Sequence, residues 1–585
     1  MVFPFRKEVL KEMKNKHNHK HISSVTIVSI LVVSLLMGSS IASSGSETAK
    51  AGEVIYTIAD STGDWGYPSP HGHYPRGPGY VRMSFIFDTL VWKDTQGFVP
   101  ALATDWEYIE DENAYLFHLR KDVTWHDGEK FTAEDVAFTF NYTKEHPSWW
   151  VDLKSVKQVE VLDEYTVKIY LKELYAPFLN DDAGTLAILP KHIWQDVKNP
   201  SEFVNEEALI GTGPFKLVDY SKTHGTYLYV ANEDYYLGKP EIGRLKFVKV
   251  SEEMASTALM RGEVNATDIP PETVVVVNGK GFTVINQSGD WNAKLMINHE
   301  KEPMSSKEFR HALAYAINRT ELVGIAQRGH AIRGSPGLLS PNSPYYNPNI
   351  VKYDYNPQRA KDILESQGYQ LKEDGYYWKD EEILELELIT APRMGFERVA
   401  EIIARQLGEA GIKVSVRSLE WKTLDSRVIS QQFDLAISGH GGIGGDPSIL
   451  NKVILGKFGY SANYTKSESL NQLLEAHLHE MDAEKRKEIV REIQKIYAEE
   501  LPALTLYYPT WYWGHDGSVD IYYTMGGIAR GIPIPLNTLA FMEYKAKVKA
   551  PAPTATEAPI PGFEPAISLF VLITVAYLIK RRRKH

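Results

Sequence analysis

The segment FHLRKDVTWHDGEKFTAEDVAFTF, residues 117–140, passes from a strand-like stretch through an Asp-Gly turn into a helix. Thr132 and Asp135 form a capping pair where the helix begins. A threonine hydroxyl accepts an unpaired backbone N–H there, and a carboxylate three residues on favours the positive end of the helix. The segment therefore predicts a strand, a turn and a capped helix in direct succession.

The same alternation extends in both directions, over residues 53–545, without a fixed repeat, and it predicts a mixed α/β body. Ser305 and Glu308 form a capping box before a second amphipathic helix. A third helix covers 399–407 and is followed by a strand at 413–416. A fourth covers 483–499 and ends before Pro502.

Length and composition limit the class of protein. A chain of 585 residues exceeds the roughly 250 to 300 residues that one hydrophobic core supports, so two or more domains are expected. With 43% hydrophobic and 24% charged residues, most of the chain can fold. The net charge is −11, and the body is more acidic still because both ends are basic. Such a surface repels phosphate backbones, so nucleic acid is not an expected partner.

The two ends of the chain predict its topology. Residues 1–43 contain a basic stretch, an apolar run at 25–37 and small residues at 40–42, which is typical of an export signal. Residues 566–579 are uncharged and apolar, and the basic cluster 580–584 follows. Basic flanks stay cytoplasmic, so we expect a single-pass membrane anchor at 562–579 and a body outside the cell.

A short Pro-rich stalk, 546–561, precedes this anchor. The order Pro561, Gly562, Phe563, apolar run and basic cluster also resembles the C-terminal sorting signal of archaeal surface proteins. That resemblance implies removal of the tail and its replacement by a lipid anchor. The chain has no cysteine, which excludes disulfides and a lipid anchor on an N-terminal cysteine. Either reading of the tail keeps the protein at the membrane.

Six blocks occur in an order that resembles one family of transport proteins. Together they resemble the solute-binding proteins of the oligopeptide, dipeptide and nickel class of ABC importers. They are VPALATDWEY (99–108) with the segment 117–140, GTGPFKLVDY (211–220), ANEDYYLGKPEIGRLKF (231–247), FRHALAYAINRTELV (309–323), YNPQRAKDILESQGY (355–369) and FDLAISGHGGIGGDP (433–447).

The resemblance implies an α/β, two-lobed clamp like the periplasmic binding proteins, with ligand between the lobes. It implies crossings between lobes near 287–298 and 507–513, and a permease and an ATPase as partners. The implied divisions are lobe one at 53–85, 206–290 and 510–545, a small subdomain of lobe one at 86–205, and lobe two at 291–509.

Aromatic side chains in polar, Gly- and Pro-rich settings are candidates for ligand contact, because their faces stack on sugar rings or peptide side chains. Each is also consistent with packing in the core or between lobes. The candidates are Trp65, Tyr67, Trp291, Trp421 and Trp511.

Asp446 is the candidate for a polar anchor. The resemblance implies that a carboxylate in this segment pairs with the α-amino group of a peptide, although an Asp before Pro447 is also an ordinary turn former. His440 and five glycines in the same segment suggest a roomier pocket that would suit an oligosaccharide. The ligand is therefore expected to be a short peptide or a short sugar.

Metal binding and catalysis find little support in the sequence. His71 and His73 lie in a Gly/Pro-rich loop, and two histidines alone are more typical of a turn than of a metal site. The chain has no phosphate-binding loop, no H-E-x-x-H and no G-x-S-x-G pattern. We expect no cofactor and no enzyme. A membrane-anchored hydrolase, or a sensor or adhesion protein on the same fold, is the alternative.

Overall fold

The computed structural model describes residues 53–151 and 153–545. The predicted signal, stalk, membrane anchor and basic tail lie outside the described residues. Within those two ranges, no helix combines the length and the apolar character that a membrane span needs.

Twelve strands form one large sheet, whose main path runs β19-β18-β20-β13-β21-β11-β1-β10-β9-β8, while β12 and β14 also pair with β21. The strands are β1 (Ile55–Asp60), β8 (Phe215–Ser221), β9 (Thr226–Ala231), β10 (Arg244–Lys249), β11 (Ala266–Asp268), β12 (Thr283–Ser288), β13 (Trp291–Ile297), β14 (Ala331–Arg333), β18 (Glu385–Thr390), β19 (Lys413–Ser418), β20 (Leu435–Gly441) and β21 (Ala503–His515).

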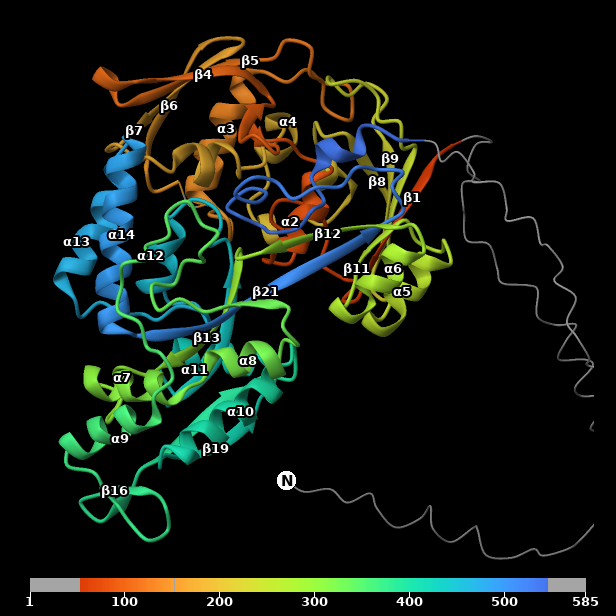
Figure 1. Cartoon of the computed structure of the whole chain (residues 1–585). Helices are drawn as coiled ribbons and strands as arrows, with labels where there is room; N and C mark the ends of the chain where they lie inside the picture. The colour runs from red at the N-terminus through yellow and green to blue at the C-terminus, as the bar shows by residue number, and fades with distance from the viewer. Residues whose placement is uncertain (1–52, 152, 546–585) are drawn as a thin grey trace, which may run out of the picture. The chain divides into compact units, whose positions relative to one another are not determined.

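The long strand β21 belongs to two parts of this sheet, as the blue arrow in Figure 1 shows. Its residues 503–507 pair with β13, and its residues 510–515 pair with β12. The chain passes from β12 to β13 through Gly289, whose φ of 99° favours glycine, and Asp290. We call β1, β8–β12 and 510–515 the first half of the sheet. We call β13, β14, β18–β20 and 503–509 the second half.

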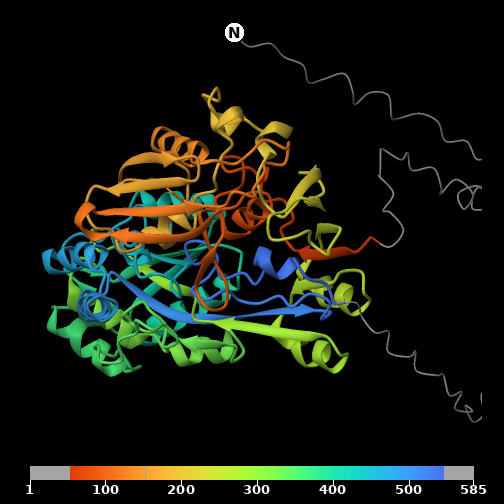
Figure 2. The ribbon, with the colours of Figure 1, turned by 90° about the horizontal axis from the view of Figure 1, so that it is seen from above.

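A separate four-stranded antiparallel sheet, in the order β4-β5-β7-β6, has its own hydrophobic cluster. Its strands are orange in Figure 2. In β7, Val167, Ile169 and Leu171 alternate with less buried residues, and they pack with residues of α3 (Ala133–Glu145). The predicted helix cap is confirmed, because the Thr132 N–H donates to the Asp135 carboxylate at 2.9 Å. The strands are β4 (Ala103–Ile109), β5 (Ala114–Leu119), β6 (Val156–Asp163) and β7 (Thr166–Leu171).

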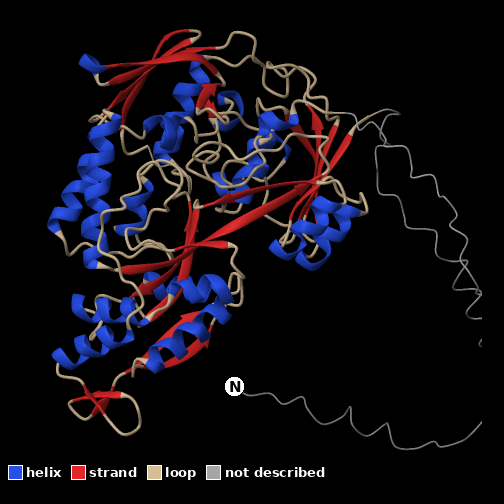
Figure 3. Ribbon diagram, viewed as in Figure 1, coloured by secondary structure: helices blue, strands red, loops and turns tan. Residues whose placement is uncertain are grey.

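The second half of the large sheet has helices on both faces (Figure 3). Leu295 and Ile437 point into the cluster that contains α10 (Phe396–Glu409), whereas Met296 and Ala436 point into the cluster that contains α14 (Ala483–Glu500). Successive residues of a strand face opposite sides, so each strand serves both clusters. Both helices and β19 occur where the sequence predicts them.

The other elements are short. The helices are α2 (Gly77–Ser84), α4 (Lys191–Trp194), α5 (Glu252–Met260), α6 (Val274–Gly279), α7 (Lys307–Ala316), α8 (Arg319–Ile325), α9 (Pro357–Ser366), α11 (Trp421–Ile429), α12 (Ile449–Ile454) and α13 (Glu468–Ala476). The strands are β2 (Val91–Lys93), β3 (Phe98–Pro100), β15 (Gln370–Leu371), β16 (Tyr377–Lys379) and β17 (Glu382–Ile383).

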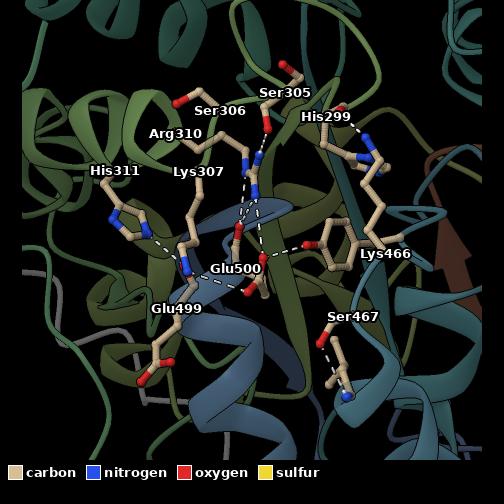
Figure 4. A network of polar contacts seen from close by, with 12 residues as sticks. His299, Ser305, Ser306, Lys307, Arg310, His311, Lys466, Ser467, Glu499 and Glu500 are labelled. Carbon is tan, nitrogen blue, oxygen red and sulfur yellow. Dashed lines mark hydrogen bonds and ion pairs between the residues drawn. The ribbon is translucent and has the colours of Figure 1, made fainter. Parts of the chain in front are cut away.

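The start of α7 differs from the prediction by one residue. Its cap is Ser306, whose Oγ accepts the Phe309 N–H at 3.2 Å, and not Ser305. The reason is Arg310, whose Nη1 donates to the carbonyl of Ser305 at 2.9 Å and so holds that residue outside the helix. The same guanidinium donates to the carbonyl of Glu500, at the end of α14, with 2.9 and 2.6 Å bonds (Figure 4).

Candidate functional site

Four aromatic rings meet where the two halves of the sheet join. Trp291 lies 6.1 Å from Trp511, edge to face, and 6.2 Å from Phe396, with the ring planes 25° apart. Phe396 in turn lies 6.4 Å from Trp421, also at 25°. The three tryptophans are half-buried and Phe396 is fully buried. We call these four residues the aromatic set.

The position of the aromatic set follows from the topology. Strands β18 and β19 are parallel, and the first residues of the helices that follow them are Phe396 and Trp421. The carboxyl ends of parallel strands meet at one edge of a sheet, which is where ligands bind in α/β proteins. Trp291 begins β13 and reaches the same place because Gly439 has no side chain. A Cβ atom at Gly439 would lie 2.1 Å from the Trp291 ring.

Two arginines approach Trp421. The guanidinium carbon of Arg393 lies 4.2 Å from the centre of its indole, and that of Arg76 lies 5.8 Å away. Arg76 precedes α2 in the first half, and its Nη2 lies 3.4 Å from Asp425 Oδ2 in α11. Burial raises the pKa of Asp425, and the positive charges of Arg76 and Arg393 oppose this rise. Two guanidinium groups and the Asp425 carboxylate therefore meet beside this indole, and Glu420, at the start of α11, also acts on Asp425.

Asp446 has a fixed partner. Both of its carboxylate oxygens accept bonds from the Arg486 guanidinium, each at 2.7 Å, and Oδ1 also accepts the Ser448 N–H at 2.8 Å. Arg486 is buried in α14. An amino group of a ligand would have to share this carboxylate with Arg486, so the anchoring role of Asp446 stays a prediction.

The roomier pocket expected around His440 is not found in the described residues, because the protein fills the space that the glycines leave. A Cβ atom at Gly439 would meet the Trp291 ring, and one at Gly444 would lie 1.7 Å from Asp290 Oδ1. His440 itself is 4% exposed, and its ring centre lies 5.4 Å from that of Tyr460. Its Nδ1 lies 3.0 Å from the Gly441 carbonyl, so Nδ1 carries the proton and Nε2 is the acceptor.

Trp65 and Tyr67 lie in the first half and are held by their own hydrogen bonds. The Trp65 Nε1 donates to Asp60 at 2.7 Å, and the Tyr67 hydroxyl donates to the Asn205 carbonyl at 2.8 Å. The Trp65 ring lies 6.2 Å from Tyr74, two residues before Arg76. Trp65 therefore packs against the segment that carries Arg76, whereas Tyr67 is bonded to Asn205.

The histidine pair of the PHGH loop is committed to packing. His73 Nδ1 lies 2.9 Å from the Ser69 carbonyl, and His73 Nε2 accepts a 3.0 Å bond from Trp150. Burial lowers the pKa values of His71 and His73 to about 4. The cavity that they line measures about 20 Å³, room for about one water. Across the described ranges, no three His, Asp or Glu side chains form a metal-binding group.

Four residues of this site were not predicted from the sequence: Phe396, Arg393, Arg76 and Asp425. Phe396 continues the apolar face of α10, and so it carries no signal of its own. Arg393 lies in a Pro-Arg-Met-Gly turn between a strand and a helix, which is the kind of loop where binding residues concentrate. Arg76 and Asp425 are 349 residues apart, and only the fold brings them together.

A family model for bacterial extracellular solute-binding proteins, family 5 (middle region), matches residues 97–461. The chain belongs to this family. The resemblance inferred from the six blocks is thereby confirmed. A family 5 relative, the dipeptide-binding protein of Escherichia coli (strain K12), is 26% identical over 483 residues, which cover 76% of this chain and 88% of the relative.

Two solved structures share the fold. NikZ from Campylobacter jejuni, in complex with Ni(L-His), superposes with a TM-score of 0.70 at 24% identity, over 82% of this chain and 97% of that one. AppA from Bacillus subtilis, in complex with a nonapeptide, gives a TM-score of 0.68 at 22% identity, over 83% and 98%. This chain is thus an extracytoplasmic solute-binding protein of the peptide and nickel class of ABC importers, and not an enzyme, with a mixed α/β periplasmic-binding-protein fold.

Proposed function

We propose that this protein captures a short peptide outside the cell and delivers it to an ABC permease. The observation that carries the proposal is the pair of guanidinium groups, Arg76 and Arg393, beside the indole of Trp421. A peptide carries a terminal carboxylate, which pairs with arginine through charge-assisted hydrogen bonds. Its apolar side chains suit the neighbouring rings of the aromatic set.

A short oligosaccharide is the second candidate. The four rings of the aromatic set offer faces that stack on sugar rings, and this contact needs no charge on the ligand. The two guanidinium groups beside Trp421 favour the peptide, because a neutral sugar would leave Arg393 and Arg76 without a charged partner from the ligand.

The ligand is proposed to lie between two lobes that correspond to the two halves of the sheet. Two crossings support this division: the β12–β13 passage at 289–290, and the change of partner in β21 between 507 and 510. Lobe one would comprise 53–85, 206–290 and 510–545, with the subdomain 86–205, and lobe two 291–509. A few residues at two crossings can act as a hinge that closes on ligand.

The test is a thermal-shift screen of residues 44–545 against short peptides and short α- and β-linked oligosaccharides. A ligand at a hundred times its Kd should stabilise the protein by about 2.7 kcal/mol. Stabilisation by peptides, lost when their C-terminal carboxylate is amidated, is the expected result. Stabilisation by sugars alone would replace the peptide with the second candidate, and no stabilisation by either class would contradict the proposal.

We also propose that the C-terminal apolar segment holds the protein at the membrane. The support is the order of apolar run and basic cluster at 566–584. In membranes isolated from cells that make the whole chain, the protein should resist extraction by alkaline carbonate and dissolve in detergent. Removal of residues 562–585 should release it into the medium, and retention of the shortened chain would contradict the anchor.

A further inference from the structure

One face of the second half of the sheet carries polar side chains in the interior. Ser438 of β20, opposite Lys294, donates to the Gly459 carbonyl at 2.9 Å, and there are four others. They are Asn292 and Lys294 of β13, His440 of β20 and Thr505 of β21. Asn292 lies opposite His440, and Lys294 lies opposite Thr505. The next residues on this face, Met296, Ala436 and Ala503, belong to the hydrophobic cluster around α14. We call the four polar residues the internal polar cluster.

The internal polar cluster is sealed from solvent. Asn292 and Lys294 are 0% exposed, Thr505 is 1% exposed and His440 is 4% exposed. Within the described residues, five of their polar atoms have no hydrogen-bond partner: Asn292 Oδ1 and Nδ2, Lys294 Nζ, His440 Nε2 and Thr505 Oγ1. Burying a polar group without a partner is unfavourable, and burying an unpaired ammonium is more so. Four such side chains at adjacent strand positions therefore indicate a shared partner.

Lys294 differs in this respect from other buried cations of the chain. Lys93 donates to the Ala529 carbonyl at 3.0 Å and to Asn180, Arg310 donates to three backbone carbonyls, and Arg486 pairs with Asp446. The pKa of Lys294 falls to about 7 through burial alone, with no carboxylate acting on it. Burial is the largest cause of the lowered pKa of His440, and the charge of Lys294 lowers that pKa further. The cluster thus has donors and a cationic group but no anion.

The internal polar cluster is connected to the aromatic set. Asn292 follows Trp291 directly in β13 but faces the opposite side of the sheet, and its cross-strand neighbour His440 lies against the ring of Tyr460. Tyr460 is within electrostatic reach of Arg76 and Asp425, the two residues that join the halves beside Trp421. Tyr460 is therefore the residue through which the cluster approaches this charged pair.

We propose that the internal polar cluster is an anion subsite that binds a carboxylate through the Lys294 ammonium, with the Asn292 amide and the Thr505 hydroxyl as further donors. The carboxylate comes from an acidic side chain of the bound peptide or from a free small anion. The first source rests on the proposed function, and the second does not.

The test compares wild type with Lys294→Met, which keeps the shape of the side chain, and with Lys294→Gln. Exposed Lys495 of α14, in the variant Lys495→Met, is the matched control. The probes are the tripeptides Ala-Glu-Ala and Ala-Gln-Ala, measured by calorimetry, and formate at constant ionic strength, measured by thermal shift. All three probes are applied to the chain as exported, without the predicted signal of residues 1–43.

If the peptide supplies the carboxylate, wild type and Lys495→Met should bind the acidic tripeptide at least about tenfold more tightly than the neutral one. Both Lys294 variants should lose that preference and keep their affinity for the neutral peptide. If a free anion supplies it, formate should stabilise wild type and neither Lys294 variant. An unchanged acidic preference in the Lys294 variants, or no response that depends on Lys294 in either arm, would overturn the subsite. Failure of both peptides to bind any variant would contradict the proposed function, and the formate arm would then decide the subsite.

Discussion

Lys294 makes a residue-scale prediction about pH. Its pKa is 10.5 in an unfolded chain and about 7 in the folded protein, so between these values the unfolded state binds more protons. The contribution of Lys294 to the stability of wild type therefore rises between pH 7 and 10.5. Below pH 7 the folded state carries the full penalty of burying the charged ammonium. Lys294→Met removes the penalty. Its free energy of unfolding should exceed that of wild type by at least about 2 kcal/mol at pH 6, and by less at pH 9.5.

Urea unfolding of the ligand-free protein at the two pH values measures this difference, because the other titrating groups are common to both proteins. A variant less stable than wild type at pH 6 would show that Lys294 has a stabilising partner inside the protein.

Trp421 is the ring of the aromatic set that two guanidinium groups approach. Trp421→Ala should weaken peptide binding by tenfold or more, about 1.5–3 kcal/mol, because buried aromatic anchors dominate binding energy. Trp378→Ala, in the small hairpin around β16, is a control, since the indole of this Trp contacts Asp374 and Lys372 of the same hairpin. Isothermal titration calorimetry measures both. Equal affinities in the two variants would remove Trp421 from the binding site.

Variants of Asp446 distinguish a structural role of its carboxylate from a ligand-binding role. Asp446→Ala should lower the free energy of unfolding by about 3–5 kcal/mol, because it leaves the buried Arg486 charge without its bidentate partner. The double variant Asp446→Leu, Arg486→Met should recover most of that stability. If the double variant also binds peptide with wild-type affinity, the carboxylate holds α14 in place; a large loss of affinity in a stable double variant would establish it as the amino-group anchor.

At the scale of elements, the sequence predicted those features that depend on neighbours in the chain. The cap of α3, the span of α10 and the end of α14 follow from local periodicity and capping. The cap of α7 was misplaced by one residue, because Arg310, which bonds to the Ser305 carbonyl, is itself held by the Glu500 carbonyl, 190 residues away in the chain. The candidates Trp291, Trp421 and Trp511 lie together in the structure. Lys294 was not predicted as a buried residue, because a lysine in a strand is ordinarily exposed to solvent.

The link between α7 and the end of α14 is itself testable. Arg310 satisfies carbonyls of Glu500, Met304 and Ser305, and it is 2% exposed. Arg310→Met should lower the free energy of unfolding by about 2–4 kcal/mol, since these carbonyls lose charge-assisted bonds in a buried place. Lys307→Met, on the same helix and 42% exposed, should change it by less than about 1 kcal/mol. Urea unfolding measures both variants, and a change in peptide affinity without a change in stability would contradict this role.

At the scale of the whole molecule, polar contacts join segments that the two crossings separate. Arg76 of the first half meets Asp425 of the second, and Ser448 of the second half donates to Asp181 near the four-stranded sheet at 3.1 Å. In the proposed two-lobed arrangement, contacts of this kind form only when the lobes meet. A ligand that binds between the lobes gains from them, because it must favour the closed arrangement to shift the population.

Arg76 and Asp425 give the quantitative form of that argument. Their side chains are 34% and 24% exposed, so the pair should contribute only about 0.2–1 kcal/mol to the closed arrangement. Arg76→Gln and Asp425→Asn should each weaken peptide binding two- to fivefold, mainly through faster dissociation, and the double variant should be no weaker than the worse single variant. Stopped-flow dissociation at 0.05 and 0.5 M salt measures this, and the difference from wild type should shrink at high salt. The pair Lys168–Glu112, which joins β7 to the turn between β4 and β5, is the control, and Lys168→Met should leave dissociation unchanged. Additive losses in the double variant would mean that Arg76 and Asp425 act independently, so that Arg76 would keep its proposed role toward the ligand and the contact between the halves would contribute nothing to binding.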